Sequence, residues 1–215
     1  CLAGGLADKV LLFPQKTNNS FIAITPEKPL NLTAFTLCMR VATDLQGNTA
    51  GILFTYSMFI ANEFHVWIDK DGIGLYFNGN NDVVHFNLHP PLFIFRTHLC
   101  FTWSSSTGLT AAWVNGQRRV YQIYGKGQTI RLGNIVVLGQ QQMNKDWLDQ
   151  WFVAQLSFVG EITDVNLWDE VLTAKEIKRL YAHTTAVKVP NVINWRTAEY
   201  DKQGIVEVMK DDFDF

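Results

Sequence analysis

Two histidines, His85 and His89, stand four residues apart in the run His-Phe-Asn-Leu-His. Zinc sites on helices use this spacing together with a general-base glutamate, which this run lacks. The surrounding residues have the pattern of a strand, on which positions four apart share a face but are separated by about 13 Å. That is too far for both imidazoles to bind one zinc ion, so we interpret them as two histidines of a sheet.

Two groups of carboxylates could also do chemistry. Asp69-Lys-Asp71-Gly72 resembles the start of a calcium loop, but an EF-hand needs glycine at its sixth position and glutamate at its twelfth. Glu161 and Asp164 could act as a glycosidase pair, but residues three apart on a regular strand point to opposite faces. The sequence also lacks a Gly-x-Ser-x-Gly elbow, a glycine loop for phosphate and a Cys-x-x-Cys pair. We therefore predict no enzymatic activity.

The cysteines and the sequons indicate a secreted protein. Three cysteines allow at most one internal disulfide and leave one thiol over. Two Asn-x-Ser/Thr sequons make Asn18 and Asn31 candidates for glycosylation. The sequence begins at Cys1 without a methionine or an apolar leader, which favours a mature chain whose signal peptide has been removed.

Composition excludes two classes of partner. Among 215 residues, 18 are Lys or Arg and 20 are Asp or Glu, so a net charge of -2 gives no basic surface for a nucleic acid. The longest apolar stretch, Gly51 to Ile60, contains hydroxyls and is shorter than the roughly 20 residues of a membrane-spanning helix. We expect no nucleic-acid partner and no membrane span.

The elements that would position these residues are mostly strands. Asp71-Gly72, Asn78-Gly79 and Asn115-Gly116 readily supply the positive φ angles of two-residue hairpin turns. Apolar residues alternate from Phe35 to Val41 and from Leu99 to Trp103, which is typical of strands with one buried face. The pattern predicts an all-β, antiparallel fold.

One segment has helical periodicity instead. Thr173-Ala-Lys-Glu176 is a capping box followed by apolar residues at helical spacing, so we predict one short helix over residues 173–182, packed on a sheet face. No linker divides the chain, which we interpret as a single domain, 1–215, with flexible ends at about 1–8 and 208–215.

The run His98-Leu-Cys100-Phe-Thr102-Trp103-Ser-Ser105 fits the pentraxin signature His-x-Cys-x-[Ser/Thr]-Trp-x-[Ser/Thr] at every fixed position. Other segments match pentraxin landmarks in the same order: Phe35-Thr-Leu-Cys38, Trp113-Val-Asn-Gly116, Val137-Leu-Gly-Gln140, Val159-Gly-Glu-Ile162, Leu167-Trp-Asp169 and Pro190-Asn-Val-Ile-Asn-Trp195. On these residues the chain resembles the short pentraxin family, the C-reactive protein and serum amyloid P type, from about Phe13 to about Val206.

The resemblance implies a flattened jelly roll of two antiparallel sheets, a concanavalin-like sandwich, with one short helix on a face. It implies a homo-oligomeric ring, usually of five subunits, and a disulfide between Cys38 and Cys100. By alternation both cysteines lie on the non-aromatic faces of their strands, so a bridge between neighbouring strands is plausible, and two reduced buried thiols are the alternative. Cys1 would then be free or would join two chains.

The resemblance also implies two calcium ions per subunit, but the aligned positions lack the expected carboxylates. The carboxylates are replaced at Ala61, Gln141, Met143 and Val153, and Leu156 stands in place of a glutamine, whereas Asn62 and Gln142 are retained. Calcium affinity depends on the number of charged oxygen ligands, so we predict weak binding, a single ion or none. If an ion is held, we expect Asn62, the Gln142 carbonyl and Asp146 or Asp149 to supply oxygens.

The aligned phosphocholine pocket consists of Trp67, Phe77 and Asp82. Trp67 and Asp82 keep the aromatic face and the carboxylate that attract a cation, whereas Phe77 would fill the space beside them. Ordinary sheet packing with an acid in a turn is the alternative interpretation.

The function that the resemblance implies is innate-immune pattern recognition. The ring would display many weak sites for phosphocholine-type or anionic carbohydrate ligands, with complement-type proteins as further partners. The alternative is a pentraxin-fold structural or interaction subunit that has lost calcium-dependent ligand binding.

Overall fold

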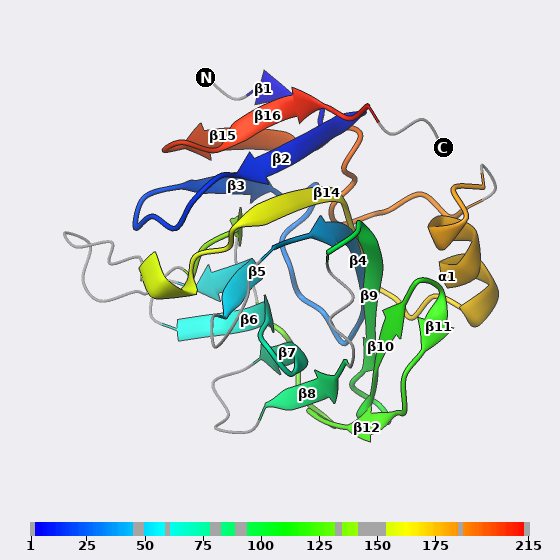
Figure 1. Cartoon of the computed structure of the whole chain (residues 1–215). Coiled ribbons are helices and arrows are strands. Elements are labelled where there is room, and N and C mark those ends of the chain that lie inside the picture. Colours follow the sequence, from blue (N-terminus) through cyan, green and yellow to red (C-terminus); the bar gives the residue numbers. More distant parts are fainter. Residues whose placement is uncertain are drawn as a thin grey trace.

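A computed structural model describes residues 3–44, 50–58, 61–77, 83–88, 94–131, 135–141, 154–184 and 187–212. Two antiparallel sheets face each other, and one helix, α1, packs on the outer face of one of them (Figure 1). The predicted all-β sandwich with one short helix is confirmed.

We call the two layers sheet A and sheet B. Sheet A has the strand order β1 (Ala3–Gly4), β15 (Glu199–Gln203), β3 (Phe21–Thr25), β13 (Val136–Leu138), β5 (Gly51–Met58), β6 (Ala61–Ile68), β7 (Gly72–Phe77) and β8 (Val84–Asn87). Sheet B has the order β11 (Gln117–Arg118), β10 (Leu109–Val114), β9 (Thr97–Ser104), β4 (Ala34–Ala42), β14 (Gly160–Trp168), β2 (Lys9–Phe13) and β16 (Glu207–Lys210). A short strand, β12 (Gln122–Ile123), also pairs with β10, and a 3-10 turn, η1 (Ala154–Leu156), precedes β14.

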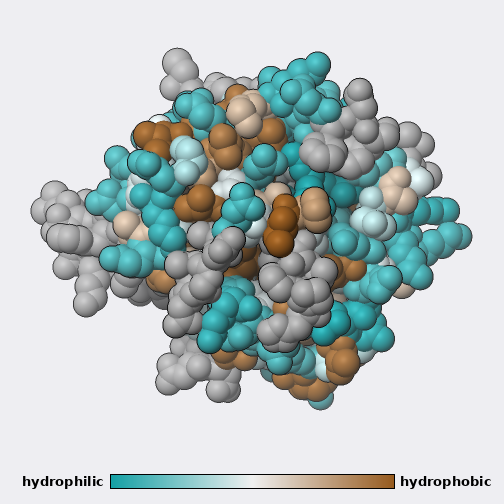
Figure 2. Space-filling model, viewed as in Figure 1, coloured by the Kyte–Doolittle hydropathy of each residue, from teal (hydrophilic) through white to brown (hydrophobic). Residues whose placement is uncertain are grey.

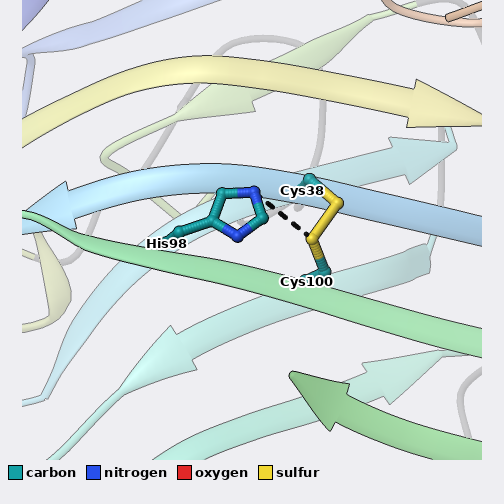
Figure 3. A group of neighbouring side chains, drawn as sticks. All are labelled: Cys38, His98 and Cys100. Carbon is teal, nitrogen blue, oxygen red and sulfur yellow. Dashed lines mark hydrogen bonds between the residues drawn. A yellow bond between two sulfur atoms is a disulfide. The ribbon is translucent and has the colours of Figure 1, made fainter. Parts of the chain in front are cut away.

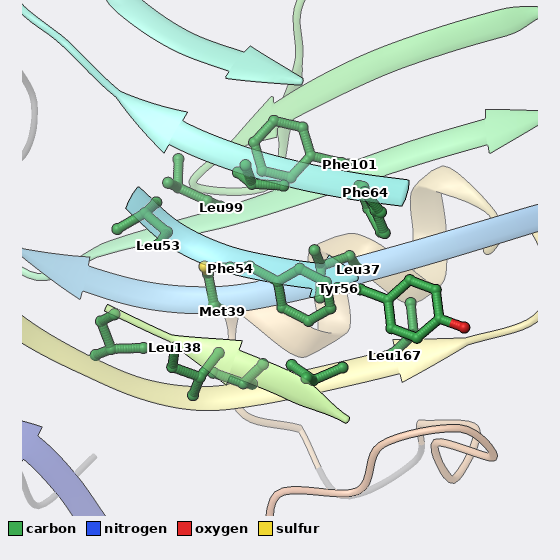
Figure 4. Close-up of a cluster of buried hydrophobic side chains, with 14 of the residues drawn as sticks. Leu37, Met39, Leu53, Phe54, Tyr56, Phe64, Leu99, Phe101, Leu138 and Leu167 are labelled. Carbon is green, nitrogen blue, oxygen red and sulfur yellow. The ribbon is translucent and has the colours of Figure 1, made fainter. Parts of the chain in front are cut away.

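The main core lies between the inner faces of the two sheets. It receives the alternating apolar residues of the strands, among them Leu37 and Met39 of β4, Phe54 of β5 and Phe101 of β9 (Figure 4). These side chains are fully buried, so the alternation seen in the sequence fixes which face of each strand turns inward.

Two of the predicted hairpins form, one of them with the predicted turn residues. Asn115 and Gly116 have φ angles of 49° and 76°, the left-handed conformation that this turn requires, and they join β10 to β11. A hairpin also joins β6 to β7, but its connection is Asp69 to Asp71, Gly72 is already the first residue of β7, and the Asp69 amide donates to the Gly72 carbonyl. Asn78-Gly79 lies outside the described residues.

Helix α1 (Ala174–Tyr181) begins at the predicted capping box. The Thr173 hydroxyl accepts from the Glu176 amide, and the Glu176 carboxylate accepts from the Thr173 amide. The helix contributes the buried side chain of Ile177 to a second apolar cluster. The other members of this cluster are Cys38, Cys100, Ala111, Trp113, Trp168 and Leu172. The capping residues therefore set where the helix starts, and the apolar stripe fixes it to sheet B.

The ends of the chain contribute strands, where the sequence suggested flexible segments. β1 pairs with β15, and β16 pairs with β2 over Glu207–Lys210. Strand pairing satisfies the backbone amide and carbonyl groups of these residues. No helix in the described part of the chain has the length and apolar character needed to cross a membrane.

Candidate functional site

An aromatic side chain lies flat on the outer face of sheet A. Trp67 on β6 pairs with Gly74 on β7, and a Cβ placed on Gly74 would lie only 2.0 Å from the Trp67 ring. The indole therefore crosses the neighbouring strand in the space that the missing side chain leaves. Trp67 remains partly exposed, so this arrangement, the Trp67 platform, offers one ring face to a ligand.

The edge of the platform is held by Asp69 and His85. The Trp67 Nε1–H donates to the Asp69 carboxylate at 3.2 Å, and His85 Nε2 lies 3.1 Å from the same oxygen. The other Asp69 oxygen accepts the amides of Asp71 and Gly72 at 2.9 and 3.0 Å. Burial raises the pKa of Asp69, but these donors outweigh it and leave the pKa below its ordinary value.

Phe77, which the sequence placed beside Trp67, lies on the opposite face of the sheet. It pairs with Phe64, is fully buried, and contacts the rings of Trp103 and Tyr124 at 4.7 and 4.6 Å. The reason is the side-chain period of two, which puts residues 74 and 77 on different faces of β7. The side chain that shares the Trp67 face is Tyr76, so the expectation that Phe77 crowds a ligand pocket is wrong.

His65 occupies the next position on this outer face and was missed by the sequence analysis. It pairs with Tyr76, and the two rings meet edge to face at 5.8 Å. His65 is buried, and its Nε2 has no hydrogen-bond partner. Burial lowers the pKa of His65 to about 4, so the imidazole is neutral at physiological pH.

Residues 142–153 contain several of the positions aligned with the family's calcium ligands, and the described residues before and after them both contact Lys16 or Thr17. Before this segment, Gln140 is buried and donates to the Thr17 carbonyl at 2.9 Å. After it, the Ser157 hydroxyl accepts the Thr17 amide at 3.2 Å, and Lys16 donates to the carbonyls of Ala50 and Gln155. Residues 16 and 17 thus contact described residues that precede and follow 142–153 in the chain.

Few of the expected calcium ligands fall in the described residues. Ala61 and Asn62 begin β6 opposite Met58 and Ser57 of β5, and Ala61 brings no oxygen from its side chain. Gln142, Asp146 and Asp149 lie outside the described residues, as do Asp82 and Cys1. At Ala61 and Gln141, the aligned carboxylate positions that fall within the described residues, the chain offers no carboxylate, and Leu156 is apolar where the family has a glutamine, so these positions do not fit a tightly bound calcium ion.

The predicted disulfide between Cys38 and Cys100 is present. The two residues face each other directly in the pairing of β4 with β9. His98 Nε2 lies 3.6 Å from the Cys100 sulfur (Figure 3). In the described part of the chain this trio is the one group of three or more His, Cys, Asp or Glu whose ligand atoms lie within 4.8 Å of one another. Because both sulfurs are bonded to each other, it is a structural bridge and not a metal centre.

Glu161 and Asp164 do not follow the regular strand assumed from the sequence. The pairing of β14 with β4 shifts between Thr163 and Asn166, and Asp164 has a φ of 54°. This bulge lets the Asp164 side chain reach the outer face of sheet B, where Arg40 lies 3.4 Å away. Glu161 accepts from Arg96 at 3.1 Å on the same face. Each carboxylate is therefore engaged by an arginine.

Both sequon asparagines, Asn18 and Asn31, are exposed. Asn18 lies on the connection before β3, and Asn31 lies on the connection between β3 and β4. A glycan on either nitrogen would point away from the core.

An apolar strip is exposed at the edge of sheet B, where β11 and β12 both pair with β10. We define this edge strip as Leu109, Val120, Tyr121 and Ile123, with Leu109 paired directly to Ile123. Val120 is 82% exposed and Ile123 is 67% exposed. Figure 2 shows hydrophobic side chains at the lower edge of the molecule, over β12. Exposed apolar side chains gathered at one edge are typical of a protein contact, and the Arg118 guanidinium stacks over the Tyr121 ring at 3.7 Å.

Comparisons with known proteins identify a family to which the chain is similar over nearly its whole length. A model of the Pentaxin family matches residues 9–210. The chain is 45% identical to C-reactive protein of Danio rerio over 207 residues, which are 96% of this chain and 90% of that protein. It is 32% identical to C-reactive protein of Homo sapiens, covering 94% and 87% of the two chains. A heptameric SAP-like pentraxin from Limulus polyphemus superposes with a TM-score of 0.79 at 25% identity, covering 98% of each chain.

Proposed function

Because this chain belongs to the Pentaxin family, whose members such as C-reactive protein are non-enzymatic binding proteins, we propose that it is a secreted recognition protein of innate immunity. Residues 1–215 form one pentraxin domain. Its ligands are phosphocholine-type or anionic carbohydrate groups on surfaces, and a ring of subunits binds them together. Many weak sites on one ring then give a useful overall affinity.

Ring assembly is supported by the family and by the edge strip. Pentraxins form cyclic oligomers, and the Limulus relative is a heptamer. A head-to-tail ring needs two complementary surfaces on each subunit, and the exposed edge strip is the proposed location of one of them. Light scattering on Val120→Lys and Ile123→Lys should give a smaller assembly than the wild type. Val189→Lys, which charges an equally exposed valine elsewhere, is the matched control. A single-subunit mass for the wild type would contradict ring assembly.

The Trp67 platform is the observation that carries ligand binding. Its indole is partly exposed, fixed by Asp69 and backed by the Gly74 backbone, so it is preorganised for a cation or a sugar ring. Asp82 remains a proposed carboxylate of the same pocket. Tyr76 takes the place of Phe77 as the side chain that shares the outer face of sheet A with Trp67.

Calcium dependence is proposed to be weak in this chain. The family binds calcium, but Ala61 and Gln141 stand where carboxylates would be expected. If an ion is held, Asn62, the Gln142 carbonyl and Asp146 or Asp149 are the proposed oxygens. When bound, the ion would supply positive charge to an anionic ligand.

The test combines calorimetry with affinity retention. We expect weak or undetectable heat on titration with calcium, and retention on phosphocholine resin that changes little when calcium is removed. Trp67→Ala should lose retention, whereas Phe95→Ala, which removes an exposed aromatic just before β9, should keep it. Tight binding of two calcium ions would overturn the weak-calcium proposal.

The second candidate is an interaction subunit without calcium-dependent ligands. Ala61 and Gln141 are the observation that favours it, because each lacks the charge that the aligned family position would have. Wild-type rings that bind neither the resin nor anionic carbohydrate would support this candidate over the first.

A further inference from the structure

The Asp69 carboxylate accepts from four donors. Its Oδ2 accepts from the Trp67 Nε1–H at 3.2 Å, and its Oδ1 accepts from the Asp71 and Gly72 amides at 2.9 and 3.0 Å. His85 Nε2 lies 3.2 and 3.1 Å from the two oxygens. A carboxylate has about four lone-pair positions, so these donors occupy its acceptor capacity. Asp69 is therefore engaged in orienting the indole and is not left free to bind a ligand.

His85 is the one of these four donors that comes from outside the hairpin of β6 and β7. It lies on β8 and pairs with Gly74, which pairs on its other side with Trp67. His85 thus stands on the far side of the glycine that the indole covers. Because Asp69 offers only acceptors, the Nε2 atom of His85 carries its hydrogen whether the imidazole is neutral or charged.

Strand β8, which carries His85, is held by side chains from sheet B. It is the last strand of sheet A, so one of its edges has no strand partner in the described part of the chain. At that edge Gln122 Nε2 donates to the His85 carbonyl at 2.8 Å, and Arg119 Nη2 donates to the Asn87 carbonyl at 2.9 Å. Within the strand, His85 Nδ1 lies 3.1 Å from Asn87 Oδ1. The imidazole is therefore fixed through both its ring and its backbone.

The stretch that holds β8 also carries part of the edge strip. Arg119 and Gln122 flank Val120 and Tyr121, whose side chains are exposed. The polar side chains of this stretch reach sheet A, whereas its apolar side chains stay on the surface. The outer face of sheet A and the edge strip are thus connected through residues 119–122.

We propose that His85 is a positioning residue of the Trp67 platform, which holds the Asp69 carboxylate as the acceptor of the indole N–H. The two backbone amides fix Oδ1 of Asp69, but Oδ2 is held by Trp67 and His85 alone among these four donors. The side chains of His85 and Asp69 are 28% and 27% exposed, so without the imidazole water would compete with the indole for Oδ2. The consequence for ligand binding rests on the function proposed for the platform, whereas the orientation of the ring does not.

Hydrogen exchange of the indole N–H tests this role on the full chain. In protein labelled with ¹⁵N-tryptophan, each of the seven tryptophans gives one indole signal, and Trp67→Phe identifies that of Trp67. We expect His85→Leu to speed exchange of the Trp67 N–H with water about tenfold, the effect of losing one charge-assisted hydrogen bond. Trp103 and Trp168, whose indoles donate to backbone carbonyls elsewhere, should keep their rates. An unchanged Trp67 rate in His85→Leu would overturn the proposal.

Two further variants separate positioning from a general loss of structure. His85→Gln can place an amide nitrogen where His85 Nε2 lies, so its Trp67 exchange rate should stay within about twofold of the wild type. Gln122→Ala should speed exchange less than His85→Leu does, and Gln117→Ala, which removes an exposed glutamine from β11, should leave the rate unchanged. A rate in His85→Gln as high as in His85→Leu would contradict the role of the Nε2–H donor. If His85→Leu does not fold, equal rates in the two glutamine variants would overturn the proposal.

Titration with phosphocholine distinguishes this proposal from the ligand function. In the wild type, phosphocholine should shift the indole signal of Trp67. His85→Leu should weaken this binding, and His85→Gln should preserve it, because preorganisation of the ring contributes to affinity. A Trp67 signal that phosphocholine does not move in the wild type would count against the platform as the ligand site. The exchange rates would still decide the role of His85, because they are measured without ligand.

Discussion

The ring of Trp67 occupies the position that a side chain on Gly74 would take. The two residues face each other across β6 and β7, and only the absent Cβ lets the indole lie on the neighbouring strand. In a pleated sheet, a glycine opposite a tryptophan thus lets the indole lie over the neighbouring strand instead of standing perpendicular to the sheet. The platform proposed to bind ligand depends on this pair.

Gly74→Ala should therefore disturb the platform. The new methyl group would meet the indole at 2.0 Å and displace it from Asp69, at a cost of about 1–3 kcal/mol in unfolding free energy. Urea unfolding followed by tryptophan fluorescence measures the loss. The double variant Trp67→Ala/Gly74→Ala should recover part of it relative to the sum of the single changes. Strictly additive effects would show that the two residues do not compete for this space.

Phe77→Ala should destabilise the core without acting at the ligand face. Phe77 is fully buried and packs against Phe35, Phe64, Trp103 and Tyr124, so truncation should cost about 3–5 kcal/mol. The milder variant Phe77→Leu should retain the ligand as well as the wild type does, per folded molecule. A changed ligand affinity in folded Phe77→Leu would place this side chain at the ligand site after all.

Replacing Cys38 and Cys100 together by alanine should lower stability by about 4 kcal/mol in the chain-entropy account, because the bridge closes a loop with a sequence separation of 62. Denaturant unfolding with and without a reductant measures the loss. Cys1→Ala leaves this bridge intact and is the control. Equal stability of the reduced and oxidised wild type would contradict the prediction.

Stability should depend on the protonation of His65. The folded pKa of about 4 lies below the ordinary value of 6.5, so the unfolded chain takes up the proton first. The contribution of the neutral imidazole is complete above about pH 6.5 and is lost as the pH falls towards about 4, by roughly 3 kcal/mol. In His65→Gln, the decrease of unfolding free energy over this interval should be correspondingly smaller. A slope identical to that of the wild type would show that His65 does not titrate there.

Chain secreted from cells with an N-glycosylation pathway should carry glycans on Asn18 and Asn31, because both are exposed within intact sequons. Removal of glycans by an amidase should reduce the apparent mass in two steps. Asn18→Gln and Asn31→Gln should each abolish one of them. Secreted chain whose mass does not change on enzymatic treatment would exclude both sites.

Local chemistry was enough to predict several features from the sequence. The Thr173 capping box begins α1, and Asn115-Gly116 turns the chain between β10 and β11, because each depends on neighbouring residues alone. The alternation from Phe35 to Val41 likewise fixed the inner face of β4. The resemblance carried by the run around Cys100 correctly gave its partner, Cys38.

Tertiary structure decided what depends on register. Pairing of β6 with β7 puts Phe77 in the core and Trp67 over Gly74, and an alignment without coordinates does not reveal these faces. The bulge at Asp164 is a second case, since one extra residue turns its carboxylate towards Arg40. Sequence alone thus determined the elements and the family, whereas the facing of single side chains was set by strand pairing, in which one residue of shift exchanges the inside of a sheet for the outside.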